Sequence, residues 1–143
     1  MRDIFKFLKH FTQAEKNYKG EPAWGDSNKV NGLLLRILDD IREEAQRPIV
    51  IHAACEIDGH AENGEHPRGD AIDFHFVHGD IKSNYLAIIK VLDKYGLTNY
   101  CGLGYYPWWA NKGFHLDVRG FKLHWVSDKP NHYMYNVNIF SYI

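Results

Sequence analysis

Two short segments of the chain alternate between apolar and metal-ligand-type side chains, and this alternation constrains the fold more than any other sequence feature. Residues 70–77 (DAIDFHFV) place an isoleucine and two phenylalanines on one side of an extended chain and Asp73 on the other. Residues 113–120 (GFHLDVRG) repeat the pattern around His115. We therefore expect two strands, each with one face in the core. If these strands are neighbours, four side chains converge on the opposite face: Asp73, His75, His115 and Asp117.

Two other segments have the spacing of amphipathic helices. Apolar side chains recur three and four residues apart in residues 28–46 and again in residues 83–95. Side chains that accept hydrogen bonds from the first backbone N–H groups of a helix favour its start. We expect Asp26 or Ser27 to cap the first helix and Ser83 to cap the second.

The remaining segments complete a prediction of the fold class. Residues 47–55 (RPIVIHAAC) form a β-branched run after a proline, and residues 101–106 (CGLGYY) are expected as a further strand. Residues 2–11 fit either a strand or a helix, and the tail 129–143 fits a final strand or an arm. Together they predict an α+β fold in a single domain, residues 1–143. Its sheet would be mostly antiparallel, with helices on one face and the ligand-type side chains on the other.

The charge balance and the apolar pattern argue against several classes of protein. The chain has 17 Lys and Arg against 18 Asp and Glu, a net charge of -1, so we expect no nucleic-acid partner. No apolar run approaches the ~20 residues of a membrane span. The N-terminal residues lack the pattern of a secretory signal, so we expect synthesis in the cytoplasm. The nine histidines favour metal or acid–base chemistry.

Three motifs follow one another along the middle and later part of the chain, between residues 66 and 120. The first, HxxGxAxD, begins at His66 and ends at Asp73; the second, GxGxYP, covers residues 102–107. The third, HxDxRG, covers residues 115–120 and is followed by Trp125. Together they resemble the zinc-dependent D-alanyl-D-alanine carboxypeptidase family of cell-wall peptidases. That family also includes phage endolysins and the zinc-bearing fold of the Hedgehog signalling domain.

The resemblance implies a zinc ion held by His66, Asp73 and His115. Zinc takes imidazole nitrogen and carboxylate oxygen as ligands, and a catalytic zinc site keeps one position open for water. Two neutral histidines and one carboxylate leave a net positive charge at the metal, which favours ionisation of the bound water. Gly69 permits a tight turn between the ligand in the loop and the ligand in the strand.

The chain departs from the family pattern at positions that matter for catalysis. The family's upstream strand commonly ends in SGYR, whose arginine is thought to polarise the substrate, whereas residues 52–56 read HAACE. Gly64 replaces the usual serine, and Lys112 replaces the acid that usually serves as general base. Asp117 is the best replacement catalytic base, because it leaves the same strand face as His115. It fits equally a partner that hydrogen-bonds a zinc histidine and fixes its tautomer.

Arg68 and His52 are the candidate substrate-binding residues. Arg68 fits a clamp for a substrate carboxylate, or a solvated loop charge. His52, with His60 and His75 as secondary candidates, fits a role in the pocket or in stabilising a tetrahedral intermediate. A histidine hydrogen-bonded within the fold is the alternative. Aromatic residues before the last expected ligand either wall a groove for a peptide or sugar or pack in the core: Tyr105, Tyr106, Trp108 and Trp109.

The resemblance predicts a zinc metallopeptidase that hydrolyses peptidoglycan stem peptides or cross-links. It would act as a carboxypeptidase or endopeptidase similar to a phage endolysin, at the cell wall after release or when carried on a virion. The alternative is a catalytically inactive module of the same fold, which binds zinc or serves a structural role in a virion.

Overall fold

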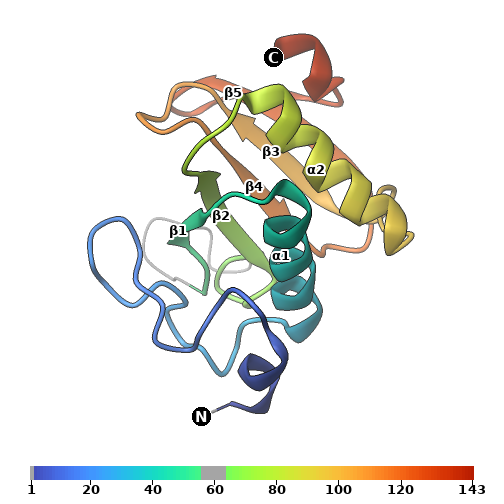
Figure 1. Cartoon of the computed structure of the whole chain (residues 1–143). Helices are drawn as coiled ribbons and strands as arrows, with labels where there is room; N and C mark the ends of the chain where they lie inside the picture. Colours follow the sequence, from blue (N-terminus) through green and yellow to red (C-terminus); the bar gives the residue numbers. More distant parts are fainter. Residues whose placement is uncertain (1, 56–63) are drawn as a thin grey trace.

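One mixed sheet and two α-helices make up the framework in a computed structural model, which describes residues 2–55 and 64–143 (Figure 1). His60, a secondary candidate above, lies outside the described residues. The strands are β1 (Ile49–Ala53), β2 (Ala71–Phe76), β3 (Gly102–Tyr106), β4 (Gly113–Asp117), β5 (Leu123–Lys129) and β6 (His132–Tyr135). The helices are α1 (Gly32–Ala45) and α2 (Ile81–Lys94), with 3-10 turns η1 (Asp3–Phe7) and η2 (Ile139–Tyr142).

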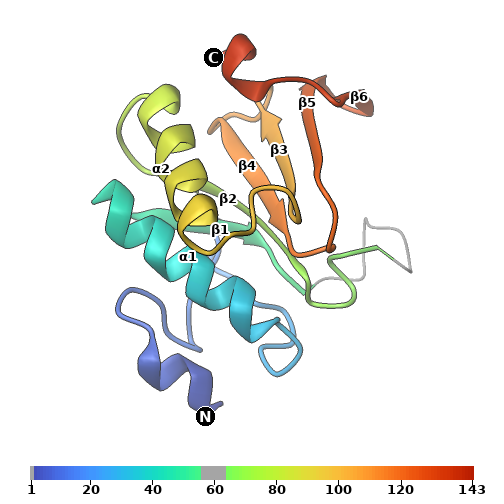
Figure 2. The same cartoon turned by 90° about the vertical axis from the view of Figure 1, so that its right-hand side faces the viewer.

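The strands lie in the order β1-β2-β4-β3-β5-β6. All neighbours are antiparallel except β3 and β5, which are parallel. Both α-helices lie on one side of this sheet (Figure 2). The prediction of an α+β fold with a mostly antiparallel sheet and helices on one face is therefore confirmed.

The core lies between the sheet and the helices. Phe74 of β2 and Phe114 of β4 are fully buried and belong to one hydrophobic cluster with the apolar stripes of α1 and α2. Because side chains alternate along a strand, Asp73 and His115, which neighbour these phenylalanines, point away from the helices. The period-two pattern of the sequence thus predicts correctly which side chains share the sheet face opposite the helices.

Both predicted α-helices are present, although their first residues differ from the predicted ones by a few positions. The first was expected from residue 28, but α1 begins at Gly32 because Asn31 is its cap and accepts from Leu33 N at 2.9 Å. The backbone N–H of Asn31 also donates to Gly69 O at 2.8 Å. This hydrogen bond fixes the loop that carries His66 to the segment before α1. The second helix is capped by Asp80 rather than Ser83; the caps expected at Asp26, Ser27 and Ser83 are wrong.

The C-terminal part contains structure that the sequence pattern did not predict. Strand β5, parallel to β3, was not expected, whereas the final strand expected in the tail 129–143 is confirmed as β6, which is followed by η2. The ambiguous segment 2–11 contains the short 3-10 helix η1 rather than a strand. Among the described residues, none of the helices has the length and apolar character needed to cross a membrane.

Candidate metal centre

Strands β2 and β4 bring two of the three expected metal ligands together. They are antiparallel neighbours, and Asp73 lies directly opposite His115 in their register. The Nδ1 atom of His115 lies 2.9 Å from Oδ1 of Asp73. The third expected ligand, His66, approaches from the loop before β2, and its Nε2 atom lies 3.2 Å from Oδ2 of Asp73. All three potential ligand atoms lie within 4.8 Å of one another, which is compatible with a single ion.

Gly69 gives the loop the shape that places His66 beside β2. Its φ of +78° lies in the left-handed region, and its N–H donates to His66 O at 2.9 Å, which closes the turn. A Cβ atom at this position would lie 2.1 Å from Lys29 O. The glycine of the HxxGxAxD motif is therefore required both by the turn and by its close packing against the segment before α1.

Each histidine of the cluster is anchored through the ring nitrogen that faces away from Asp73. His66 Nδ1 donates to Ala54 O at 2.8 Å, and His115 Nε2 donates to Asp117 Oδ2 at 2.7 Å. A carbonyl and a carboxylate accept hydrogen bonds only, so each contact fixes a proton on the outer nitrogen. The inner nitrogens, which face Asp73, are therefore the ones that a cation would take as ligands, in place of any proton they carry toward that carboxylate. Metal-binding histidines in proteins are held in the same way.

Asp117 is buried completely and is surrounded by donors. Its Oδ1 atom accepts from Gly102 N at 3.1 Å and from Arg119 Nε at 2.8 Å, while Oδ2 accepts from His115 and from Arg119 Nη2 at 2.5 Å. A Cβ at Gly102 would lie 2.3 Å from Oδ2, so only glycine leaves room for this carboxylate. Burial raises the pKa of Asp117, but Arg119 and His115 outweigh it and hold the pKa well below its ordinary value.

The histidines and carboxylates of the cluster stabilise one another's charged forms. Burial lowers the pKa of His115, but its hydrogen bonds to Asp117 and Asp73 outweigh that effect and raise the pKa to about 9. Burial likewise raises the pKa of Asp73, and the two facing histidines, His66 first, lower it well below its ordinary value. A cation at this position would displace the Nδ1 proton of His115, so metal binding would release a proton.

Trp125 of β5 packs against the ring of His115. The two ring centroids lie 5.0 Å apart, and the indole Nε1 donates to Tyr106 Oη at 3.0 Å. A Cβ at Gly104 would lie 2.5 Å from the indole, so the second glycine of the GxGxYP motif admits this ring. Sequence analysis recognised Trp125 only as part of a resemblance and missed its packing role, because β5 itself was not predicted.

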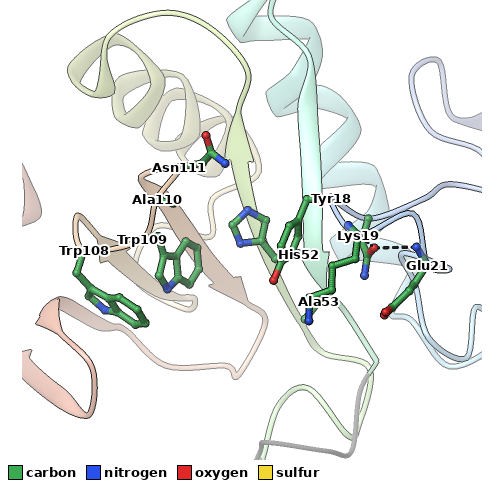
Figure 3. Close-up of a pocket in the computed structure, with 10 residues that line it drawn as sticks. Tyr18, Lys19, Glu21, His52, Ala53, Trp108, Trp109, Ala110 and Asn111 are labelled. Carbon is green, nitrogen blue, oxygen red and sulfur yellow. Dashed lines mark hydrogen bonds between the residues drawn. The ribbon is translucent and has the colours of Figure 1, made fainter.

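The two candidate substrate-binding residues occupy different surroundings. Arg68 is exposed, and its Nη2 atom lies 2.5 Å from Glu65 Oε1. His52 on β1 is half-buried, and its Nε2 atom lies 2.5 Å from His75 Nδ1. Burial, with a smaller effect from His75, lowers the pKa of His52 to about 4, so it is neutral near pH 7. His52 lines a cavity between two loops (Figure 3). The ion pairs of Arg68, with Glu65 and Asp70, lie within its own loop.

Glu65 is a carboxylate that sequence analysis overlooked. It directly precedes His66, and its Oε2 atom is buried without a hydrogen-bond partner among the described residues. It also interacts electrostatically with Arg119. A buried carboxylate oxygen without a donor is uncommon in a folded protein. The burial of this oxygen could be found only from the structure, because nothing in the loop sequence distinguishes Glu65 from a solvated residue.

Comparisons of the chain with protein-family models, with curated proteins and with solved structures found no match.

Proposed function

We propose that the chain is a zinc-dependent peptidase that cleaves peptidoglycan stem peptides or cross-links. The observation that supports this best is the anchoring of His66 and His115. Both outer nitrogens are tied to acceptors, so that both inner nitrogens face the carboxylate of Asp73. The motif resemblance supplies the substrate class, since the three residues occupy the positions that hold zinc in the cell-wall peptidases.

The donor set fits zinc. His66, Asp73 and His115 would hold the ion through two nitrogens and one oxygen, and three protein ligands are the usual number in a catalytic zinc site. When bound, zinc supplies a Lewis acid that polarises the scissile carbonyl and promotes ionisation of a water molecule. Asp117 keeps the proton of His115 on Nε2 and so leaves Nδ1 for the metal.

The contacts of Asp117 favour the positioning role over the catalytic-base role that the sequence left equally open. Both of its oxygens accept hydrogen bonds from fixed donors, and the side chain is excluded from solvent. Glu65, with one buried oxygen unpartnered among the described residues, is our candidate for the carboxylate that transfers the proton. Replacing each acid by its amide separates the two roles, because only a positioning residue is expected to alter metal affinity.

The alternative function is a catalytically inactive zinc-binding or virion-associated structural module. The observation that favours it is that Lys112, at the family's general-base position, is an exposed residue, while Asp117 is saturated with donors. Such a module would bind zinc at the same three residues without cleaving a peptide.

The test is hydrolysis of purified peptidoglycan fragments by the zinc-loaded protein, followed by mass spectrometry of the released peptides. We expect cleavage by the wild type and none by His115→Ala. His132→Ala is the matched control, because His132 is an exposed histidine whose contact is with Asp128 on the same hairpin. Zinc binding without cleavage of any stem peptide or cross-link would favour the structural module instead.

A further inference from the structure

A cavity of about 400 Å³ lies beside the metal cluster, between two loops that are distant in the sequence. One wall comes from the turn before Trp24 and carries Tyr18; the other comes from the β3–β4 loop and carries Trp108 and Trp109 (Figure 3). His52 lies between them. The volume falls within the ~300–1,000 Å³ of sites that bind small ligands.

The lining of this cavity is aromatic and polar rather than aliphatic. Its rings belong to Tyr18, His52 and the two tryptophans, and its polar groups include Lys19 and Asn111. No aliphatic side chain larger than alanine is among the described residues that line it. An aliphatic peptide side chain would therefore find few matching surfaces. A pyranose ring has apolar C–H faces that pack on aromatic rings and a rim of hydroxyls that hydrogen-bond to polar groups, and it matches both parts of the lining.

The aromatic rings are held in place by their neighbours. Trp109 is stacked on Tyr106 with ring centroids 4.4 Å apart and an interplanar angle of 17°. The ring of His52 lies 4.8 Å from that of Trp109 and 5.1 Å from that of Tyr18. Rings fixed in this way lose little conformational freedom when a ligand packs on them.

The opposite wall is also ordered. The side chain of Asn17 accepts from the backbone N–H groups of Lys19 and Glu21, each at 2.9 Å, and thereby closes the turn that displays Tyr18. Tyr18 is 58 % exposed although it contacts His52, so a substantial part of its ring is free for a ligand.

The cavity adjoins the candidate zinc site. Ala53 of β1 lines the cavity and is the register partner of Asp73 on β2. A sugar bound between the two loops would lie next to the cluster, so a peptide attached to that sugar has a short path to the metal.

We propose that this cavity is a saccharide-binding subsite that takes one or more pyranose rings of the glycan strand from which the stem peptide branches. The identification of the sugar as part of the substrate rests on the proposed function, whereas saccharide binding itself does not require the metal. The cavity therefore orients the substrate through its glycan, and the three metal-binding residues act on its peptide.

The experiment is calorimetric titration of the purified protein with chitotetraose, a soluble oligomer of N-acetylglucosamine without peptide. We expect binding by the wild type, and about tenfold weaker binding by Tyr18→Ala and by Trp109→Ala through the loss of a stacking surface. Tyr100→Ala is the matched control, because Tyr100 is 56 % exposed and is not among the residues that line the cavity. It should bind as the wild type does.

Two further arms separate this inference from the proposed function. His115→Ala should lose peptide hydrolysis but keep its affinity for chitotetraose. The inference is overturned if the wild type does not bind chitotetraose, or if Tyr18→Ala weakens binding of a free stem peptide and leaves that of chitotetraose unchanged. Saccharide binding by a protein that cleaves no peptide would support the subsite and refute the peptidase.

Discussion

Asp117→Asn should weaken zinc binding by changing the tautomer of His115. The amide has one oxygen and one NH₂ group, whereas both oxygens of Asp117 now accept from fixed donors. With the oxygen at the Oδ1 position, the contacts to Gly102 N and Arg119 Nε survive, and the NH₂ group faces His115 Nε2. Two donors cannot share that contact. The neutral form of His115, which is the form that binds a metal, is then driven to carry its single proton on Nδ1, the nitrogen that the metal needs.

The NH₂ group also faces Arg119 Nη2, which is a second donor, but the effect on the metal comes from the lost contact with His115. Removing the group that orients a metal-binding histidine typically lowers metal affinity about 10–100-fold, equivalent to roughly 1.4–2.7 kcal/mol. We therefore expect the dissociation constant for zinc to rise by that factor in Asp117→Asn. A competition titration against a chromophoric chelator measures it, and nitrogen chemical shifts of His115 report the tautomer.

The control for this variant is Asp128→Asn, which removes an exposed aspartate whose partner is His132. It should bind zinc with wild-type affinity. An unchanged zinc affinity in folded Asp117→Asn would refute the reasoning, because it would show that the buried carboxylate does not determine which nitrogen of His115 is available.

Three further predictions concern other residues. Gly69→Ala should lower the free energy of unfolding by more than ~2 kcal/mol, because its Cβ would meet Lys29 O, whereas Gly96→Ala, with a similar positive φ but open space around it, should lose only ~1 kcal/mol; urea unfolding compares them, and equal losses would contradict the packing argument. His124 is buried, and burial lowers its pKa from 6.5 to about 4, so the folded state resists protonation. The resistance of His124 to protonation should add up to ~3 kcal/mol to the free energy of unfolding above pH 6.5, and this should be lost as the pH falls to about 4. His124→Gln should flatten the dependence of the unfolding free energy on pH between these values, and an unchanged slope would contradict this prediction. Glu65→Gln should lower the rate of peptide hydrolysis at least ~100-fold with unchanged zinc affinity, and a wild-type rate would exclude Glu65 from proton transfer.

The sequence predicted those parts of the fold that depend on local periodicity. Alternation in residues 70–77 and 113–120 identified two strands and the face that carries Asp73 and His115, because the two sides of a strand meet different environments. The start of α1 was missed because Asn31 both caps the helix and donates its backbone N–H to Gly69 O, a contact that the local pattern does not show. A pattern of neighbouring residues cannot predict a contact between residues 31 and 69, which are far apart in the sequence.

The candidate site was predicted in its residues but not in its geometry. The motifs identified the three expected ligands, and the structure brings them together. Which nitrogen of His115 faces Asp117 depends on side-chain torsions that a sequence pattern does not specify. The sequence therefore left open whether Asp117 is a catalytic base or a positioning residue. The contact between Tyr18 and His52 joins a surface turn to a strand, and no spacing in the chain signals it.

The most direct test of the account is anomalous diffraction at the zinc absorption edge from crystals of the protein grown with zinc. We predict a single strong peak within coordination distance of His66 Nε2, a carboxylate oxygen of Asp73 and His115 Nδ1, with no further protein ligand. A zinc ion bound elsewhere, or one enclosed by a fourth protein ligand at this cluster, would contradict a catalytic metal centre.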